Sequence, residues 1–317
     1  MKARTYPGLT QVAAAVIERP DGSFLLGQRG PDTFYSGWWE FPGGKVETGE
    51  TPHDALVREL HEELEIEVLR ATPWIVREHV YEHAHVRLNF FRVDRWRGEL
   101  RDHVHSALSW QQPGAATVAP MLPANAPVLA ALALPGFYGI THAGEIGVEA
   151  QMAVLEAALE RGLRMVQLRE PNLAPDERAA FAGAAHALCR AAGAKLLING
   201  DAELARRVGA DGIHLSAGQL AATADRPDFP LVGASCHTRA ELEQAARLGL
   251  DFAVLGAVKP TASHPGRAAI GWARFAELAA GLPLPVYALG GLDRADIDAA
   301  REAGAHGIAA IRGSWAA

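Results

Sequence analysis

Apolar and polar residues alternate in short runs through the first part of the chain. This two-residue period is typical of strands that bury one face. Two runs, at 11–18 and 23–29, flank Pro20-Asp21-Gly22, whose residue types favour a turn. Further strand-like runs follow at 74–81, 85–94 and 107–110. The pattern therefore predicts a region rich in sheet.

Residues 51–66 change to the period of a helix. The apolar side chains that recur at helical spacing are Ala55, Leu56, Leu60 and Leu64. Thr51 followed by Pro52 is typical of a helix start. Threonine can cap the first turn, and proline, which has no amide hydrogen, fits there because amide hydrogens of the first turn have no partner within the helix. We therefore predict one amphipathic helix here.

Beyond residue 136, short apolar runs alternate regularly with stretches rich in Ala, Leu and Arg. The runs lie at 137–141, 165–169, 195–199, 212–216, 231–235, 252–256, 285–290 and 307–312. Eight strand–helix repeats predict a (β/α)8 TIM barrel. The chain stops at Ala317, shortly after the eighth run, so we expect a truncated last helix.

A stretch rich in Pro and Ala at 112–136 separates the two patterns, with a candidate hinge at Leu134-Pro135-Gly136. A chain of 317 residues suits two domains. We place them at 1–132 and 133–317, which makes the chain a two-domain protein of the α/β and α+β classes.

Composition narrows the function classes. The net charge is −7 and there is no basic stripe, so we expect no nucleic-acid partner. Two cysteines argue against a disulfide framework and fit a reducing cytoplasm. No run approaches the roughly 20 apolar residues of a membrane span, and the start has no secretory pattern. We therefore expect a cytoplasmic protein without a membrane partner.

Three glutamates of the predicted helix carry the candidate chemistry. Glu59, Glu62 and Glu63 are spaced i, i+3 and i+4, so their carboxylates crowd one helix face and repel each other unless a cation lies among them. Carboxylates suit Mg²⁺ or Mn²⁺, which can bridge phosphate groups and activate a water for attack at phosphorus. Arg58 can orient one carboxylate, and Gly43-Gly44 lets the backbone approach a metal closely. The alternative interpretation is a solvated acidic face.

Residues 44–66, GKVETGETPHDALVRELHEELEI, resemble the Nudix box, and the flanks resemble MutT-type Nudix hydrolases, the 8-oxo-dGTP diphosphatases. The similarity covers 24–132 and includes GQR at 27–29, EFPGGKVETGETP at 40–52 and LPANAPV at 122–128. It implies a mixed sheet with flanking helices. It also implies Mg²⁺-dependent (or Mn²⁺-dependent) hydrolysis of a nucleoside triphosphate to the monophosphate and pyrophosphate, serving nucleotide-pool sanitation.

The resemblance also implies roles for single residues. The metal ligands would be the carbonyl of Gly43 and the carboxylates of Glu59, Glu62 and Glu63, with Glu59 also orienting the attacking water. The substrate-binding residues would be Arg29, Phe41, Gly44, Lys45 and Asn125, with Arg29 and Lys45 on the triphosphate side and Phe41 framing the base. The amide of Asn125 offers a donor and an acceptor, which suits the altered edge of 8-oxoguanine. Its alternative role is a helix N-cap.

Two positions depart from the MutT pattern. Glu65 stands where the box usually has glycine, and we expect this to change only the helix end. In the loop at 101–106, the ungapped register puts Val104 at the place of a metal-binding glutamate. Its neighbours with ligand-type side chains are Asp102, His103 and His105. The resemblance leaves open whether one of them replaces that glutamate.

Residues 137–313 resemble the thiamine-phosphate synthase and TenI (thiazole tautomerase) family. The matching pieces are QLRE at 167–170, LLIN at 196–199, ADGIHL at 210–215, GASCHT at 233–238, ALGGL at 288–292 and GAHGIAAI at 304–311. The ligand or phosphate site implied by this family comprises Gln167, Arg169, Asn199, Ser235, His237, Gly290, Gly291 and Arg312. Its ligand would be a phosphorylated thiazole or pyrimidine.

Several charged residues of the synthase pattern are missing. Pro171 stands in place of a diphosphate-binding lysine, and His264 falls at a second lysine. Gly200 and Gln219 fall where the family has magnesium-binding acids. Without these groups nothing neutralises a departing diphosphate, so we predict that the barrel is not an active thiamine-phosphate synthase.

Three hypotheses follow for the whole chain. The first is an 8-oxo-dGTP diphosphatase that avoids mutation by cleaning the nucleotide pool. The second is a thiamine-pathway enzyme whose first domain hydrolyses thiamine-related pyrophosphates while the barrel handles phosphorylated intermediates. In the third, the barrel is a non-catalytic ligand-binding or docking module.

Overall fold

The computed structural model describes residues 8–261 and 268–315. The chain divides into two compact units, Met1–Leu134 with Ala280–Pro283 and Pro135–Ala279 with Leu284–Ala317. No described helix is long and apolar enough to cross a membrane.

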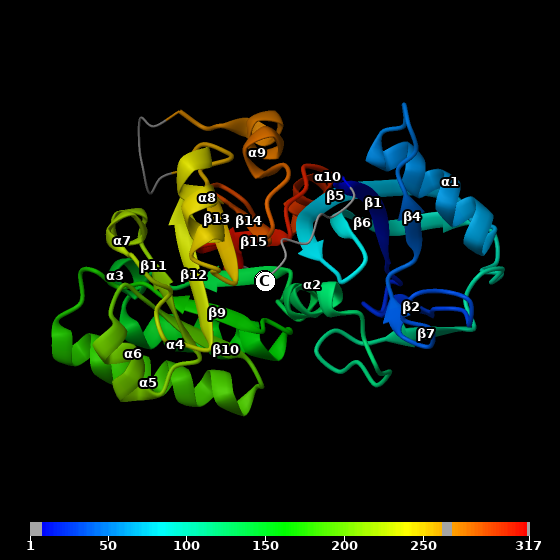
Figure 1. Cartoon of the computed structure of the whole chain (residues 1–317). Helices are drawn as coiled ribbons and strands as arrows, with labels where there is room; N and C mark the ends of the chain where they lie inside the picture. The colour runs from blue at the N-terminus through cyan, green and yellow to red at the C-terminus, as the bar shows by residue number, and fades with distance from the viewer. Residues whose placement is uncertain (1–7, 262–267, 316–317) are drawn as a thin grey trace. The chain divides into compact units, whose positions relative to one another are not determined.

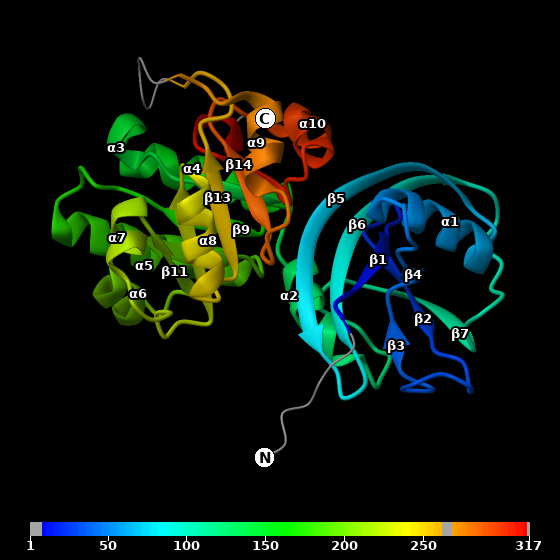
Figure 2. The same cartoon turned by 45° about the horizontal axis from the view of Figure 1, so that its top comes forward.

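The first unit is built on two sheets. The larger has strand order β4-β1-β6-β5, in which β1 and β6 are parallel and the other neighbours antiparallel; the smaller, antiparallel sheet has order β3-β2-β7. The strands are β1 Thr10–Ile17, β2 Phe24–Gln28, β3 Trp39–Glu40, β4 Gly43–Lys45, β5 Glu67–Val80, β6 His85–Arg97 and β7 Ala107–Gln111. Figure 2 shows β5 and β6 curving together beside β1. The predicted mixed sheet is confirmed.

Strand β5 begins at Glu67, well before the run at 74–81 that predicted it. The register of β5 against β6 shifts between Val68 and Arg70, between Arg70 and Ala71, and between Pro73 and Val76. Each bulge interrupts the two-residue alternation on which the prediction rested. The early half of this edge strand therefore carries no readable strand pattern.

Helix α1 (Pro52–Leu64) begins as predicted. The Thr51 side chain accepts a hydrogen bond from the amide of Asp54, and Pro52 occupies the first turn. The apolar stripe Ala55, Leu56, Leu60 and Leu64 is fully buried. Because this burial fixes the rotation of the helix, its glutamates face away from the core. Figure 1 shows α1 beside β4 and β1.

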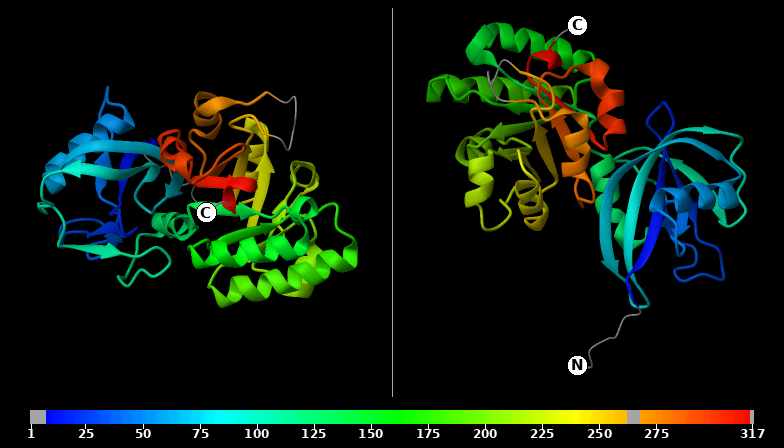
Figure 3. Two further views of the ribbon diagram at one scale, coloured as in Figure 1. Left: turned by 180° about the vertical axis from the view of Figure 1, so that it is seen from behind. Right: turned by 90° about the horizontal axis from the view of Figure 1, so that it is seen from above.

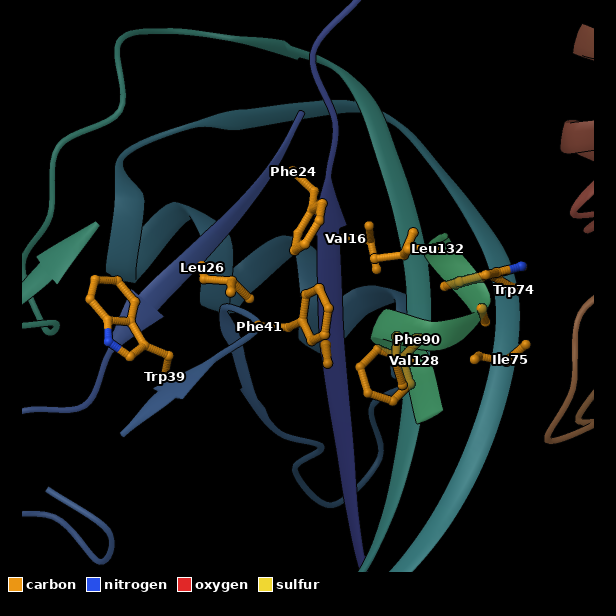
Figure 4. Close-up of a cluster of buried hydrophobic side chains, with 12 residues drawn as sticks. Val16, Phe24, Leu26, Trp39, Phe41, Trp74, Ile75, Phe90, Val128 and Leu132 are labelled. Atoms are coloured by element: carbon orange, nitrogen blue, oxygen red, sulfur yellow. The ribbon is translucent and has the colours of Figure 1, made fainter. Parts of the chain in front are cut away.

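A separate core lies on the opposite face of the larger sheet. Helix α2 (Ala126–Leu132) follows the 3-10 turn Pro123–Asn125 and contributes Val128, Ala131 and Leu132 to this core. In Figure 4 the ring of Phe41 lies between those of Phe24 and Phe90, at centroid distances of 5.8 and 5.6 Å. The sheet is thus covered by α1 on one face and α2 on the other.

The second unit is a closed barrel of parallel strands, ordered β8-β9-β10-β11-β12-β13-β14-β15 around the ring. The strands are β8 Phe137–Ile140, β9 Met165–Leu168, β10 Lys195–Asn199, β11 Gly212–Leu215, β12 Leu231–Cys236, β13 Phe252–Gly256, β14 Val286–Leu289 and β15 Gly307–Ala310. The helices are α3 Ala143–Ile146, α4 Val148–Glu160, α5 Pro175–Ala191, α6 Ala202–Val208, α7 Ala217–Ala222, α8 Arg239–Arg247, α9 Gly271–Ala279 and α10 Ile297–Glu302. Figure 3 shows helices outside the strand ring. The predicted TIM barrel is confirmed, and its described part closes with the 3-10 turn Arg312–Ser314.

Candidate active site

The acidic face of α1 lies against β4, which the sequence presented only as part of a loop rich in glycine. Strand β4 pairs with β1 so that Gly44 lies opposite Ala13. A Cβ atom on Gly44 would overlap the carboxylate of Glu59, and one on Gly43 would overlap the carbonyl oxygen of Ala13. Glycine at these two positions therefore lets the backbone and the helix carboxylates come together.

Arg58 connects the first helical turns to the preceding loop. Its Nε and Nη2 atoms donate to the two carboxylate oxygens of Glu50, at 2.8 and 3.0 Å. Its Nη1 atom lies 3.0 Å from Glu59 and 3.3 Å from Glu62, and Nη2 also donates to the Lys45 carbonyl. The hydrogen bonds from Arg58 lower the pKa of Glu50 to about 2. Glu50 is thus a permanent anchor for Arg58, which in turn holds Glu59.

Glu63 is the most perturbed carboxyl group of this face. It accepts a hydrogen bond from the Gly43 amide at 3.2 Å. Burial raises the pKa of Glu63 to about 8, and the charge of Glu59 adds to the effect. The charges of Glu40 and Asp102 act in the same direction. Negative charges on α1, on β3 and in the loop at 101–106 therefore all raise the pKa of Glu63, and a cation would relieve this repulsion.

The donor set fits a hard divalent cation. Across residues 8–261 and 268–315, no three His, Cys, Asp or Glu side chains already form a closed metal cluster. Mg²⁺ commonly binds through one or two carboxylates, several waters and substrate phosphates rather than in a closed protein cage. Glu59 and Glu63 provide such carboxylates, and the missing side chain of Gly44 lets the Glu59 carboxylate lie directly against the backbone of β4.

The loop at 101–106 lies over the C-terminal end of α1. Val104, which the ungapped register placed at the metal-binding glutamate, has a side chain that faces solvent and is 53% exposed. Asp102 and His105 turn inward instead, with side chains 20% and 4% exposed and 3.1 Å apart. His103 pairs with Glu65 at 2.7 Å.

Glu65 does more than alter the helix end. It adopts the left-handed conformation, with φ of +54°, that the usual glycine would take more easily. Its carboxylate binds Arg101 at 3.3 Å as well as His103. The expectation that this replacement changes only the helix end was therefore incomplete, because Glu65 also anchors the following loop.

The predicted substrate-binding residues are distributed over different environments. Arg29 is paired with Glu40 at 2.6 Å and donates to the Phe34 carbonyl at 2.7 Å. Phe41 is buried in the core, whereas Lys45 is exposed. The structure therefore brings Gly44 and Lys45 to the glutamates, while Arg29 is engaged with a neighbouring carboxylate.

Asn125 is 4% exposed and directly precedes α2, but its side chain makes no capping bond. The alternative role as a helix N-cap is therefore not the one it has here. Its amide nitrogen makes only long contacts, 3.5 Å to the Trp39 carbonyl and 3.9 Å to the sulfur of Met121. The amide is thus buried with weak bonds.

Tyr81 is a residue that sequence reasoning missed at this place. Its hydroxyl is hydrogen-bonded to the backbone of Ala124, next to Asn125, and burial raises its pKa to about 12. Its ring neighbours those of Tyr35 and His83, at centroid distances of 5.5 and 5.7 Å. The signal for it in the sequence was the number of aromatic residues in the loop before β3 and in the loop between β5 and β6.

In the barrel, four of the predicted ligand residues line one cavity of about 400 Å³: His237, Gly290, Gly291 and Arg312. His237 uses Nδ1 to bind the Gly256 carbonyl at 3.1 Å. Arg312 forms an exposed ion pair with Glu145 at 2.7 Å. Gly290 and Gly291 both have positive φ, and a Cβ on either would overlap the segment at 257–260.

Gln167 and Ser235 lie elsewhere, in a buried polar chain inside the barrel. Gln167 donates to the hydroxyl of Tyr138 at 3.1 Å, and His214 lies 2.9 Å from the Ser235 hydroxyl. Burial lowers the pKa of His214 to about 3, so this histidine is neutral at ordinary pH. These two predicted residues are therefore not brought to the cavity of His237, and Arg169 is exposed at the end of β9.

Asn199 lines a second cavity, of about 570 Å³. At this place the synthase family has magnesium-binding acids, and this chain has Gly200 and Gln219 instead. Gly200 has a φ of +68° and carries no side chain, and Gln219 fills the adjoining space by donating to the Gly200 carbonyl at 2.7 Å. Asp201 caps α6 and pairs with Arg178 at 3.1 Å. The position of His264 lies outside the described residues.

Comparison with known proteins matches each unit to a different family. Residues 13–131 match the NUDIX domain model, and residues 137–313 match the thiamine monophosphate synthase model. The Escherichia coli CTP pyrophosphohydrolase is 42% identical over 129 residues, covering 39% of this chain and 90% of that protein. A putative thiamine-phosphate synthase of Geobacter sulfurreducens is 38% identical over 181 residues, covering 55% of this chain and 84% of that protein.

Among solved structures, the E. coli ORF135 protein is 40% identical and covers 38% of this chain and 86% of its own, with a TM-score of 0.35. The family assignments rest on the two sequence models and on the extent of the sequence matches. The chain therefore belongs to the Nudix hydrolases through its first unit and to the thiamine monophosphate synthase family through its second.

Proposed function

We propose that the first unit, a Nudix pyrophosphohydrolase, uses Mg²⁺ to hydrolyse an oxidised purine nucleoside triphosphate, 8-oxo-dGTP above all, to the monophosphate and pyrophosphate. The observation that carries this substrate is the buried, weakly bonded amide of Asn125. Guanine presents only acceptors along its N7 and O6 edge, whereas 8-oxoguanine carries a hydrogen on N7. The oxygen of an asparagine can accept that hydrogen while its nitrogen donates to a neighbouring carbonyl.

The residues that would hold the cation are Glu59, Glu62 and Glu63, with the carbonyl of Gly43. A bound Mg²⁺ supplies charge neutralisation for the phosphates and lowers the pKa of a bound water. Arg58 keeps Glu59 in place through its pairing with Glu50, and Glu59 would orient the attacking water. Lys45 is exposed beside this face and would meet the triphosphate.

Arg29 needs a changed role in this proposal. Its guanidinium is held by Glu40 and the Phe34 carbonyl, so it fixes the loop at 30–38 in the absence of substrate. A triphosphate would have to compete with Glu40 for it. Tyr81, bonded to the backbone of Ala124, and Tyr35, whose ring centroid lies 5.5 Å from that of Tyr81, would offer aromatic faces to a base.

The test is pyrophosphate release from 8-oxo-dGTP, dGTP, CTP and thiamine-type pyrophosphates in Mg²⁺, with Glu59→Gln in parallel. We expect 8-oxo-dGTP to give the highest kcat/KM and Glu59→Gln to lower it by roughly 10²–10⁴-fold. Glu67→Gln, which removes an equal charge from an exposed pair with Arg97, is the matched control.

Asn125→Ala tests the base assignment separately. It should lower kcat/KM for 8-oxo-dGTP by about 10-fold or more and leave dGTP nearly unchanged. CTP is included because the E. coli relative is a CTP pyrophosphohydrolase. A preference for CTP, or an Asn125→Ala effect equal on every nucleotide, would refute the purine assignment while leaving the hydrolase intact.

For the barrel we propose a binding role for a small phosphate ester, such as a phosphorylated thiazole, without thiamine-phosphate synthesis. Two observations favour it: Gly290, Gly291 and His237 line a cavity of about 400 Å³, and Gly200 and Gln219 line the second cavity where the synthase family has magnesium-binding acids. Titration calorimetry with a thiazole phosphate should show binding that Gly291→Ala abolishes. Formation of thiamine phosphate by the full chain would overturn the proposal.

A further inference from the structure

The loop at 101–106 is fastened to the end of α1 and to β2 by backbone hydrogen bonds. The amide of Arg101 donates to the Leu64 carbonyl and that of His103 to the Glu63 carbonyl, both at 3.0 Å. At the other end, the amide of Ser106 donates to the Gln28 carbonyl at 2.8 Å. The loop therefore has a fixed position over the residue that carries the most buried carboxylate of α1.

Glu65 strengthens this fastening in a way that the usual glycine cannot. Its carboxylate reaches Arg101 at 3.3 Å and the Nε2 atom of His103 at 2.7 Å. The left-handed backbone costs a non-glycine residue about 1 kcal/mol. The two departures from the family pattern, Glu65 and the altered loop, are thus physically connected.

Within this loop, Asp102 is the carboxylate that turns inward. Its Oδ1 atom accepts from the amides of Val104 and His105, at 3.2 and 2.8 Å, and lies 3.1 Å from Nδ1 of His105. All these bonds involve Oδ1. Within the residues that the structure describes, Oδ2 of Asp102 accepts no hydrogen bond. The amide of the next residue, His103, donates to the Glu63 carbonyl at 3.0 Å, which keeps Asp102 at the end of α1 that carries Glu63.

His105 braces Asp102 from below. Its side chain is 4% exposed and lies flat on β2, where a Cβ atom on Gly27 would overlap the imidazole ring. Carboxylates that bind a metal are themselves hydrogen-bonded by neighbouring groups, which fix their orientation.

We propose that Asp102 replaces the missing loop glutamate as a carboxylate ligand of the divalent cation, with His105 as its positioning residue. The proposal rests on the metal-dependent hydrolysis proposed above but not on the identity of the nucleotide. Val104 takes no part, and His103 acts only through Glu65.

The experiment measures Mn²⁺ binding to the full chain without substrate, by electron paramagnetic resonance and by calorimetry. Asp102→Asn keeps an oxygen that can accept the Val104 and His105 amides but removes the charge. We expect Mn²⁺ affinity to fall by about 10-fold or more, because a charged ligand is lost. His105→Ala should lower Mn²⁺ affinity less than Asp102→Asn does. His105→Asn, whose amide can still donate to Asp102, should bind Mn²⁺ more tightly than His105→Ala.

Two controls separate this assignment from its competitors. His103→Asn removes one of the two Glu65 contacts of the loop and leaves the Arg101 contact in place, so it should lower Mn²⁺ affinity far less than Asp102→Asn. Val104→Glu, introduced into Asp102→Asn, restores the glutamate of the family register and should not rescue binding, because that side chain points to solvent. Circular dichroism of each variant verifies that the first unit stays folded.

Unchanged Mn²⁺ affinity in folded Asp102→Asn, with loss in Glu59→Gln, would overturn the proposal, as would rescue by Val104→Glu. Absence of turnover with 8-oxo-dGTP, by contrast, would bear only on the nucleotide. The two failures are therefore distinguishable.

Discussion

Acidic side chains gather at two places in this chain, along α1 of the Nudix unit and around the ends of β9 and β10 in the barrel. On α1, burial raises the pKa of Glu63, and the negative charges of Glu59, Glu40 and Asp102 raise it further. In the barrel, Glu170 accepts two backbone amides, at 2.7 and 2.8 Å, and Asp201 caps α6 and pairs with Arg178.

The difference is between an acidic face whose charges repel one another and a pair of acidic residues whose charges are neutralised by hydrogen bonds and an ion pair. Unrelieved repulsion among buried carboxylates costs stability and is found where function requires it. Glu170 and Asp201 use both of their carboxylate oxygens in such bonds, whereas Asp102 uses only Oδ1. Gln219, a neutral residue, completes this closure by bonding to Gly200.

The largest contrast should come from adding one methyl group to each place. Gly44→Ala puts a Cβ atom where the Glu59 carboxylate lies, so we expect nucleotide hydrolysis to fall by roughly 10²-fold or more. Gly200→Ala meets only the flexible end of Gln219 and a positive φ, so it should cost about 1 kcal/mol and leave hydrolysis unchanged. Steady-state kinetics and thermal unfolding of both variants decide the matter; equal loss of hydrolysis would contradict the contrast.

A second prediction uses the pH dependence of stability without metal. The pKa of Glu63 is about 8 in the folded chain against an ordinary value of 4.5, so the folded state holds this proton more tightly than the unfolded state. Stability is therefore fully present below about pH 4.5 and is lost as the pH rises through about 8. In EDTA, urea unfolding of the first unit should lose up to a few kcal/mol across this range.

Glu63→Gln should flatten this pH dependence, because glutamine does not ionise. Added Mg²⁺ should stabilise the wild type at pH 8 more than the variant, since the cation binds only the folded site. Glu67→Gln, an exposed change of the same charge, serves as the control and should keep the wild-type slope. A variant that loses stability with pH as steeply as the wild type would show that Glu63 does not carry the effect.

The sequence predicted elements well where one period dominated. Helix α1 and the barrel strands followed directly from apolar spacing, and Thr51 and Pro52 marked the helix start. The early half of β5 was missed because its bulges remove the alternation. Short strands such as β4 owe their existence to pairing with β1, which no local pattern reveals.

The candidate site was predictable only as far as its residues share one helix. The spacing of Glu59, Glu62 and Glu63 fixed their common face in advance. The inward turn of Asp102 depends on its bonds to His105 and on fastening of the loop to α1, both of which are tertiary. An ungapped alignment compares positions along the chain and carries no information on such a turn. It therefore matched the family's glutamate to Val104, whose side chain faces solvent.

The smallest effect is expected from returning one acid to the barrel. Gln219→Glu replaces the amide that donates to the Gly200 carbonyl with an oxygen that cannot donate, so we expect a loss of about 1–2 kcal/mol in barrel stability. No Mn²⁺ site beyond that of the first unit should appear in electron paramagnetic resonance, because Gly200 supplies no second carboxylate and Asp201 stays paired with Arg178. Hydrolysis by the first unit should match the wild type. An additional Mn²⁺ signal in this variant would mean that one substitution suffices to create a metal site in the second barrel cavity. The acidic residues of the barrel and of α1 would then differ less in their capacity to bind a cation than we infer.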